Sequence, residues 1–372
     1  MLIEHSTAAT LTIDLGAIVE NWRFLGARAG SSGSACAAVV KADAYGLGLA
    51  EVGPALYQAG CRDFFVALVD EGVQLRALIP PDARVFVLHG PQPGAEIECA
   101  EHALVPVLNS PDQLQRWSNL ANIRGERVPA ALQVDTGMRR LGFDSRDFEA
   151  LDSECFASAK LSGVEPILLM SHLVSAEDRA DPINRIQLEQ FQIARKHWSG
   201  LRCSLANSSG IFLGPAWHFD LLRPGAALYG VAPVLNQTNP MRPVIRLQAP
   251  IIQTRTIAPG DRVGYNHTWR ASRPTRVATL SVGYADGYLR SLSNCAMVRF
   301  MGQTAPLIGR VSMDTITVDV TELPEHELTP GAQFDLIDSA HDINQVATEA
   351  GTNAYEILTS LGLRYRRRYL AA

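Results

Sequence analysis

Lys41 is the residue of this sequence best placed to do chemistry. It directly follows the apolar run 36–40, so its side chain begins where a buried strand is expected to end. Burial of an amine in a low-dielectric setting lowers its pKa, which makes the neutral form available as a nucleophile or as the partner of an aldehyde. The plainer interpretation is a lysine at a strand end whose ammonium group reaches solvent. Both interpretations are compatible with its position.

A second set of residues has the composition of an anion site. The small residues Ser208, Ser209 and Gly210 open a short helical segment, whose free N–H groups attract negative charge. Gly225 follows a proline and lets the backbone approach a ligand closely. Barrel enzymes often hold a phosphate near their seventh and eighth strands, which is where these residues fall. Ordinary helix capping and turn formation is the alternative for each of them taken singly.

Two charged or titratable residues stand beside apolar runs. His172 ends the run that begins at residue 167, and Arg223 precedes the run 226–230. A histidine on an apolar strand is commonly a hydrogen-bonded core residue, and an arginine before a strand commonly forms a surface ion pair. Unrelated structural roles would not place several such residues at the same end of one barrel. We therefore expect these residues to share a site with Lys41.

The elements that would position these residues repeat through most of the first 230 residues. Short apolar runs alternate there with longer segments of helical pattern. The eight runs, which are the predicted strands, are 36–41, 64–69, 84–89, 104–109, 130–135, 167–172, 202–207 and 226–230. They are continuously apolar, as expected of parallel strands buried on both faces. Eight β-then-α units predict a closed (β/α)8 barrel with its active site at the C-terminal strand ends.

Helix start signals support this pattern. Ser110 and Pro111 supply an N-cap and a proline at the first helical position before the helix predicted at 113–120. Asp181 and Pro182 do the same for the helix predicted at 183–198.

The pattern changes after a polar linker at 236–240. Alternating and β-branched runs predict antiparallel strands at 244–257, 275–282, 297–300, 315–320 and 333–337, with short helices at 343–350 and 354–361. The basic cluster 364–368 is expected to be a helical tail. We therefore expect a barrel domain at 1–236 and a β-rich domain at 241–372, with the first residues, up to about 14, as a candidate strand of the second domain.

Composition excludes several classes of protein. Of 372 residues, 47% are hydrophobic and 19% are charged, which excludes a disordered chain or a fibre. The net charge of −5 argues against a nucleic-acid or anionic-membrane binder. The chain shows no secretory signal and no apolar run of membrane-spanning length. The cysteines are scattered without a CxxC pair, which argues against a metal site and fits a reducing cytoplasm. They are Cys36, Cys61, Cys99, Cys155, Cys203 and Cys295.

A strand-end lysine, a phosphate site and a pocket without metal ligands together suggest pyridoxal phosphate as the cofactor. At this point the chain resembles a known family, the alanine racemases. Val-Val-Lys-Ala-Asp-Ala-Tyr-Gly at 39–46 resembles the motif of their cofactor lysine, and Val-Asp-Thr-Gly-Met-Arg-Arg-Leu-Gly at 134–142 resembles their second motif. Further matches follow in order at 171–173, 206–208, 223–230, 263–266, 282–287, 309–314 and 354–356. The resemblance extends from about Asp14 to Tyr365.

The resemblance implies a pyridoxal-phosphate enzyme that interconverts L-alanine and D-alanine and supplies D-alanine for peptidoglycan. Racemisation needs two acid–base groups on opposite faces of the cofactor. The family pattern assigns the proton of D-alanine to Lys41, which also carries the cofactor, and that of L-alanine to Tyr265. A cationic network through His172 and Arg223 would help the phenol to act as a base. The other cofactor-binding residues implied are Tyr45, His172, Ser208, Arg223, Gly225, Ala226 and Tyr355.

The resemblance also implies a head-to-tail homodimer with shared active sites. Tyr265 and Met313 would enter the partner's site, and Arg140 with the Met313 backbone would bind the substrate carboxylate. The implied entrance residues are Tyr284, Arg290, Arg310 and Asp314. A narrow entrance favours alanine and admits serine as a second substrate, since one extra group changes selectivity by only ~1–3 kcal/mol.

One departure from the family pattern bears on substrate binding. Many members carry a lysine, often carbamylated, where this chain has Gln133. A carbamate would give Arg140 a negative partner, which a neutral amide does not. We therefore expect Gln133 to hydrogen-bond Arg140 directly, or a small anion such as chloride to lie beside Arg140.

Two other functions remain open on the sequence. A broad-specificity amino-acid racemase would share the fold, although such enzymes typically carry a signal peptide. A non-catalytic pyridoxal-phosphate-binding protein would resemble the barrel alone, so the second domain with Tyr265 and Met313 argues against it.

Overall fold

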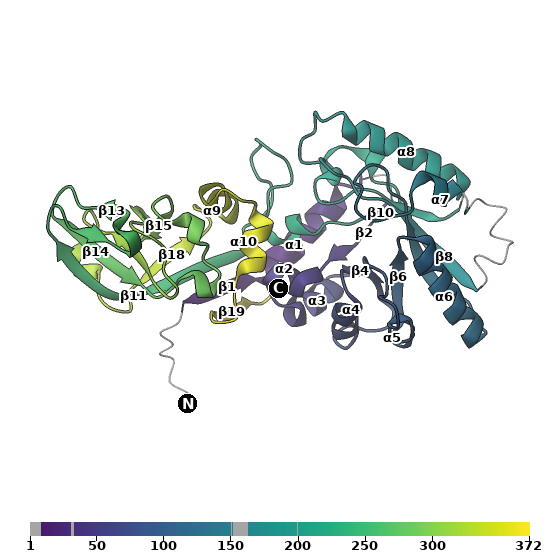
Figure 1. Ribbon diagram of the computed structural model, residues 1–372, viewed down its shortest axis with the longest axis horizontal. Coiled ribbons are helices and arrows are strands. Elements are labelled where there is room, and N and C mark those ends of the chain that lie inside the picture. Colours follow the sequence, from purple (N-terminus) through teal and green to yellow (C-terminus); the bar gives the residue numbers. More distant parts are fainter. Residues whose placement is uncertain (1–8, 31–32, 150, 152–162, 199) are drawn as a thin grey trace. The chain divides into compact units, whose positions relative to one another are not determined.

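The structure is a computed structural model that describes residues 9–30, 33–149, 151, 163–198 and 200–372. The described residues divide into two compact units. The barrel unit holds those within 18–228 and 232–241, and the β unit holds 9–17, 229–231 and 242–372. Figure 1 colours both units along the sequence. Cys155 lies outside the described residues.

Parallel strands form the wall of the barrel unit in the order of the sequence. They are β3 (Ala38–Val39), β4 (Asp63–Val66), β5 (Arg84–Val87), β6 (Leu104–Leu108), β7 (Val128–Gln133), β8 (Val164–Met170) and β9 (Arg202–Ser204). Every residue of β4 and of β6 is buried, as predicted for strands covered on both faces.

The barrel closes through a strand that the sequence pattern misplaced. The run 226–230 was predicted as the eighth strand, but Ala226–Tyr229 forms the 3-10 helix η6. The eighth strand is β10 (Leu221–Leu222), which pairs in parallel with β2 (Ala35–Cys36). On its other side, the Arg223 N–H donates to the Ala206 carbonyl at 2.9 Å. Two residues are too few to show a period, so pairing alone reveals this strand. Arg223 therefore follows the eighth strand instead of leading into it.

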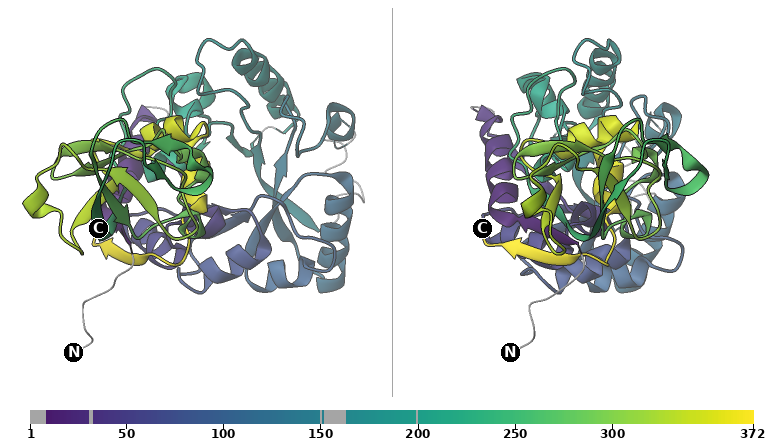
Figure 2. Two further views of the ribbon diagram at one scale, coloured as in Figure 1. Left: turned by 60° about the vertical axis from the view of Figure 1, so that its left-hand side comes forward. Right: turned by 90° about the vertical axis from the view of Figure 1, so that its left-hand side faces the viewer.

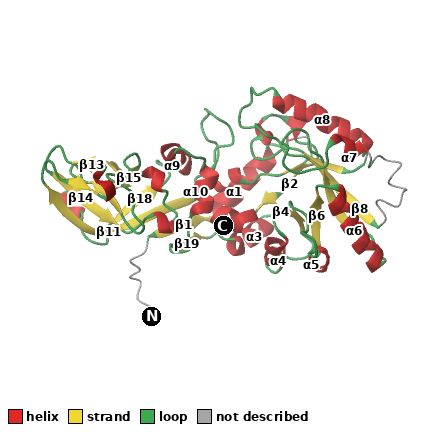
Figure 3. Ribbon diagram, viewed as in Figure 1, coloured by secondary structure: helices red, strands yellow, loops and turns green. Residues whose placement is uncertain are grey.

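Helices cover the outside of the strands in the barrel unit, as Figures 2 and 3 show. They are α1 (Leu15–Ala27), α3 (Leu49–Gln58), α4 (Val69–Arg76), α5 (Glu96–Glu101), α6 (Pro111–Arg124), α7 (Ser145–Glu149) and α8 (Ile183–His197). Short 3-10 turns lie at η4 (Gly210–Phe212) and η5 (Pro215–Trp217). The predicted start of α6 is confirmed, because the Ser110 hydroxyl accepts a hydrogen bond from the Gln113 N–H. The helix predicted at 183–198 is confirmed as α8.

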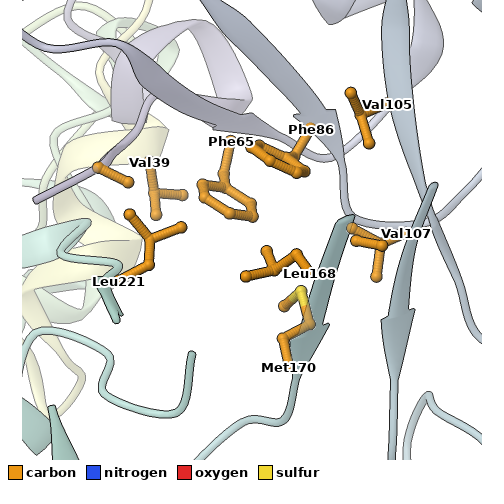
Figure 4. Close-up of a cluster of buried hydrophobic side chains, with 10 residues drawn as sticks. Val39, Phe65, Phe86, Val105, Val107, Leu168, Met170 and Leu221 are labelled. Carbon is orange, nitrogen blue, oxygen red and sulfur yellow. The ribbon is translucent and has the colours of Figure 1, made fainter. Parts of the chain in front are cut away.

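The barrel interior is filled by apolar side chains drawn from successive strands (Figure 4). Phe65 of β4 and Phe86 of β5 stack with their ring centroids 4.6 Å apart. Leu168 and Met170 of β8 and Leu221 of β10 pack in the same cluster. Burial of each large side chain in this way contributes about 1.5–3 kcal/mol to the stability of the fold. The strand ends next to the cluster are therefore held in fixed positions.

The β unit is built on a mostly antiparallel sheet. Its strand order is β16 (Gln303–Pro306), β15 (Met297–Phe300), β18 (Gln333–Ile337), β11 (Ile245–Ile257), β1 (Thr10–Asp14) and β19 (Arg366–Leu370). Strand β14 (Thr275–Leu280) pairs with β11 and with β17 (Ile316–Asp319), and β12 (Arg262–Val263) pairs with β13 (Trp269–Arg270). Helices α9 (Ile343–Ala350) and α10 (Ala354–Ser360) complete the unit, with 3-10 turns η7 (Tyr265–His267), η8 (Tyr284–Asp286), η9 (Arg290–Leu292) and η10 (Glu325–Glu327).

The basic tail of the chain is a strand, so the helix expected at 364–368 is wrong. Arg366–Leu370 pairs in parallel with Thr10–Asp14. Arginine has a good helix propensity, but a weak local preference yields to strand pairing. In the part of the chain that the structure describes, we find no helix that is both long and apolar enough to cross a membrane.

Candidate active site

Lys41 emerges at the C-terminal edge of the barrel into an unusual turn. The four residues that follow it, Ala42–Tyr45, have φ between 53° and 55°, so the segment labelled α2 (Lys41–Gly46) is a left-handed turn made of residues other than glycine. Left-handed helical geometry costs roughly 1–2 kcal/mol per residue for such residues. Backbone strain of this kind persists only where the surrounding structure enforces it, and it gathers at functional sites. The sequence carries no signal for the turn, because alanine has no preference for positive φ.

The surroundings of Lys41 favour its neutral form. Burial lowers the pKa of the Lys41 amine, and the positive charge of Arg140 lowers it further, while the carboxylate of Glu71 acts in the opposite direction. Lys41 is half-buried where the chain leaves the end of β3. It differs in this from an ordinary surface lysine.

Tyr45, Ser208 and Gly225 come together at the same edge of the barrel. The Ser208 hydroxyl oxygen accepts hydrogen bonds from the N–H groups of Gly225 (3.0 Å) and Ala227 (3.2 Å), so its own proton is free to be donated elsewhere. A Cβ atom at Gly225 would lie 2.3 Å from the Tyr45 hydroxyl. Two hydroxyl groups therefore meet at a backbone that only glycine permits, which is the arrangement of an anion cradle.

The helical segment expected after Ser208 is shorter than an anion-binding helix. It is the three-residue turn η4, and the Gly210 N–H is already bonded to the Asn207 side chain at 2.9 Å. The negative charge that this cradle accepts is therefore held mainly by the hydroxyl groups of Ser208 and Tyr45, with little help from a helix dipole.

Arg223 is 3% exposed and is fixed by two hydrogen bonds from its guanidinium. One goes to the Ser171 carbonyl and one to the Ser204 hydroxyl, so two neighbouring strand ends hold it. Burial lowers the pKa of Arg223 to about 9, which leaves the group protonated at neutral pH. Ser204 had no signal in the sequence beyond its place within the strand predicted at 202–207.

His172 lies among positive charges. Burial is the main reason that the pKa of His172 falls to about 3, and the charges of Arg223, Arg140 and Lys41 add to it. The imidazole is therefore neutral at pH 7. In the expected network through His172 and Arg223, the positive charge therefore belongs to Arg223.

Gln187 is a buried residue that the sequence analysis missed. Its side chain donates to the His172 carbonyl (2.9 Å) and the Thr136 hydroxyl (3.2 Å) and accepts from the Val174 N–H (2.9 Å). It lies on the buried face of α8 with apolar residues. A glutamine at such a position in the sequence could have indicated a buried, hydrogen-bonded side chain.

Gln133 does not form the hydrogen bond that we expected. Its amide donates to the Leu141 carbonyl at 3.1 Å, whereas the guanidinium of Arg140 is exposed. The loop between them is shaped by Asp135, whose carboxylate accepts from the Gly137 N–H at 2.8 Å. The fold thus turns Arg140 outward and keeps Gln133 inside.

The expected site residues that follow residue 241 lie in the β unit. The side chain of Tyr265, in η7, is 68% exposed, and that of Met313 is 54% exposed. Arg290 and Arg310 line one hollow of about 440 Å³. Tyr284 is held beside the Met313 segment, because the N–H groups of Tyr284 and Ala285 donate to the carbonyls of Ser312 and Met313 at 3.0 Å.

Two more of these expected residues are placed by their own elements. Asp314 accepts a hydrogen bond from Arg364 at 2.8 Å. Tyr355, in α10, is 42% exposed. Across the residues that the structure describes, His, Cys, Asp and Glu side chains nowhere gather in threes as metal ligands would.

Comparison with known proteins gives the same family for both units. A model of the alanine racemase N-terminal domain matches residues 13–233, and a model of the alanine racemase C-terminal domain matches residues 244–369. The alanine racemase of Rhodospirillum rubrum is 50% identical over 366 residues, which are 98% of this chain and 97% of that protein. A catabolic alanine racemase of Agrobacterium fabrum is 47% identical over 360 residues, or 97% of this chain and 92% of the relative.

A solved structure agrees with this chain over nearly its whole length. The alanine racemase of Bartonella henselae, which carries covalently bound pyridoxal phosphate, superposes with a TM-score of 0.92 at 40% identity, covering 98% of this chain and all of that one.

Proposed function

The chain belongs to the alanine racemase family, whose reaction interconverts L-alanine and D-alanine, and from this premise we propose how its side chains carry out that reaction. The observation that carries the proposal is the edge of the barrel, where a partly buried lysine lies with the hydroxyl groups of Ser208 and Tyr45, which meet beside Gly225. A covalently attached, phosphorylated aldehyde cofactor needs those two features together.

The residues present fit pyridoxal phosphate. When bound, this cofactor withdraws electrons from the Cα atom of the amino acid and so makes its proton removable. Lys41 would hold the aldehyde carbon. The phosphate would bind to the hydroxyl groups of Tyr45 and Ser208, and we assign Gly225, Ala226 and Tyr355 to the same task.

Lys41 and Tyr265 are the two acid–base groups of the proposal. Lys41 Nζ takes the α-proton of D-alanine, and its lowered pKa increases the neutral fraction able to do so. The Tyr265 hydroxyl takes the α-proton of L-alanine on the opposite face. The exposure of Tyr265 in its own unit suits a side chain that serves a second copy of the chain.

Arg223 would face the pyridine nitrogen and His172 would flank the ring. Arg223 stays protonated at neutral pH, so it would donate a hydrogen bond to the nitrogen without transferring a proton. His172 is neutral at pH 7, so it would contribute shape without charge.

The substrate carboxylate would be bound by Arg140 and the Met313 backbone N–H. Because Gln133 is bonded to Leu141, a small anion such as chloride beside Arg140 remains the proposed source of negative charge there. Tyr284, Arg290, Arg310 and Asp314 would form the entrance.

The dimer, the cellular role and the location belong to the proposal as well. A head-to-tail homodimer would place Tyr265 and Met313 of each chain in the partner's site. D-alanine formed in the cytoplasm would supply peptidoglycan, although catabolic members are among the relatives.

The first test is formation of D-alanine from L-alanine, followed with D-amino-acid oxidase. We expect turnover by the native chain and a large loss in Tyr265→Phe, which keeps the ring and removes the hydroxyl. Cofactor absorbance without formation of D-alanine would favour a non-catalytic binding protein. Turnover of L-serine at a rate comparable to that of L-alanine would favour the broad-specificity alternative.

The second test mixes two inactive variants, Lys41→Ala and Tyr265→Phe. If active sites are shared between subunits, a mixed dimer has one site with both substitutions and one with neither. Equal refolded mixtures would then recover about a quarter of the native activity. A mixture that stays inactive, while forming dimers, would show that each chain supplies its own Tyr265.

A further inference from the structure

Glu71 forms hydrogen bonds in two directions from the first turn of α4. One carboxylate oxygen, Oε2, accepts from the N–H groups of Ala67 (2.7 Å) and Leu68 (3.1 Å). These bonds are the usual capping of a helix by an acid at its third position. The other oxygen, Oε1, accepts from the Ala42 N–H at 2.7 Å. Capping of α4 needs only the first oxygen, so the second has another role.

Ala42 is the first residue of the left-handed turn after Lys41. Within the turn, the Ala44 N–H bonds to the Val40 carbonyl at 2.9 Å. The leading N–H groups of a helical turn have no partner inside it, so they need an outside acceptor. Glu71 supplies that acceptor to Ala42. It thereby fixes the start of a conformation that alanine residues avoid on their own.

We propose that Glu71 is a positioning residue for Lys41, whose carboxylate holds the left-handed turn and so aims the lysine side chain from the end of β3. The catalytic part of this inference rests on the proposed function, and the structural part does not. Glu71 belongs to α4 and Lys41 follows β3, so the carboxylate joins the ends of two neighbouring strand–helix units. The two hydrogen bonds that Oε2 accepts at the start of α4 give the carboxylate a fixed geometry.

Glu71 acts on Lys41 through its charge as well as through its hydrogen bond to Ala42. The charged or titratable groups that face Lys41 are Arg140, Glu71 and His172, and the last is neutral at pH 7. Burial and Arg140 lower the pKa of Lys41, whereas Glu71 raises it. Loss of the carboxylate charge therefore lowers the pKa of Lys41 further.

The test compares Glu71→Gln with Asp70→Asn. Glutamine keeps one oxygen for the cap of α4 but turns an NH2 group toward the Ala42 N–H. Asp70 lies one residue earlier in the same helical turn and is exposed, so its change removes an equal charge without touching Ala42. A third variant, Glu71→Asp, keeps the charge but shortens the reach to Ala42.

The first readout is hydrogen–deuterium exchange of the segment 40–48 in the full-length chain, with and without cofactor. We expect exchange at 42–44 to be on the order of tenfold faster in Glu71→Gln and Glu71→Asp, because a charge-assisted hydrogen bond is lost. Asp70→Asn should leave it unchanged. Equal exchange in all variants overturns the inference.

The second readout is acylation of Lys41 as a function of pH in the cofactor-free chain, measured by mass spectrometry. The midpoint should move to lower pH in Glu71→Gln and stay in place in Asp70→Asn, a difference that a purely structural role would not produce. An unmoved midpoint in Glu71→Gln refutes the electrostatic part.

In the holoenzyme kcat should fall more than KM rises. Failure of the native chain to form D-alanine would instead contradict the proposed function.

Discussion

Gly225→Ala tests the cradle directly, because its effect can be estimated from one distance. The new Cβ would lie 2.3 Å from the Tyr45 hydroxyl, 3.1 Å from Tyr45 Cζ and 3.3 Å from Val39 Cβ. Carbon and oxygen atoms in ordinary contact stand about 3.5 Å apart, so the hydroxyl must move by about 1 Å. The backbone of Tyr45 is fixed in the left-handed turn, so the movement falls on its side chain.

Overpacking of this size costs about 1–3 kcal/mol of stability. Displacement of a ligand-binding group by about 1 Å can reduce activity by about a hundredfold. We therefore expect Gly225→Ala to lower the urea midpoint modestly and to weaken pyridoxal phosphate binding strongly, as followed by absorbance titration. Gly53→Ala is the matched control: its Cβ would meet Leu75 at 2.7 Å in the same unit, so it should affect stability and leave cofactor affinity unchanged.

The cause is isolated by repeating Gly225→Ala in a Tyr45→Phe background. Removing the hydroxyl removes the atom in closest contact, so the stability cost should shrink by at least 1 kcal/mol in the double variant. An equal cost in both backgrounds would refute the reasoning, because it would place the clash somewhere other than the Tyr45 hydroxyl.

Three further expectations concern stability and pH. His172→Gln should protect the fold against acid. The pKa of His172 is about 3 in the folded chain and about 6.5 in the unfolded chain, so the native chain loses stability as the pH falls below 6.5, by roughly 2 kcal/mol at pH 5. Urea midpoints measured at pH 7 and pH 5 should show a smaller loss in the variant. Ala42→Gly should be neutral or stabilising in urea unfolding, because relief of positive φ offsets chain entropy, whereas Ala50→Gly in the exposed face of α3 should cost about 1 kcal/mol. Gln187→Leu should cost about 2–4 kcal/mol in the same assay, because it leaves the Val174 N–H and the His172 carbonyl unpaired; a cost below about 0.5 kcal/mol would contradict its role.

Much of the barrel unit follows from local patterns. Continuous apolar runs mark β4 and β6, which are buried along their whole length. Ser110 and Pro111 mark the start of α6 by capping chemistry that needs no other part of the chain. Lys41 was identified in the same way, since a lysine that directly follows a buried strand must leave the core at the strand end.

The elements that the sequence misplaced depend on their partners. Leu221–Leu222 is a strand only because Ala35–Cys36 lies beside it, and Arg366–Leu370 is a strand only because it pairs with Thr10–Asp14. Neither segment has the period of a strand. The charged tail suits the edge of a sheet, where arginine side chains discourage pairing with other chains.

The sequence alone determined which residue types stand at the strand ends, because burial and helix capping are encoded within a few neighbouring residues. Only the tertiary structure decided the left-handed turn after Lys41, the neutral state of His172 and the bond between Glu71 and Ala42. Each of these depends on groups far apart in the chain: a carboxylate 29 residues away, and positive charges brought together from separate strands. Electrostatic fields and hydrogen bonds act through space, so they exist only once the barrel has closed.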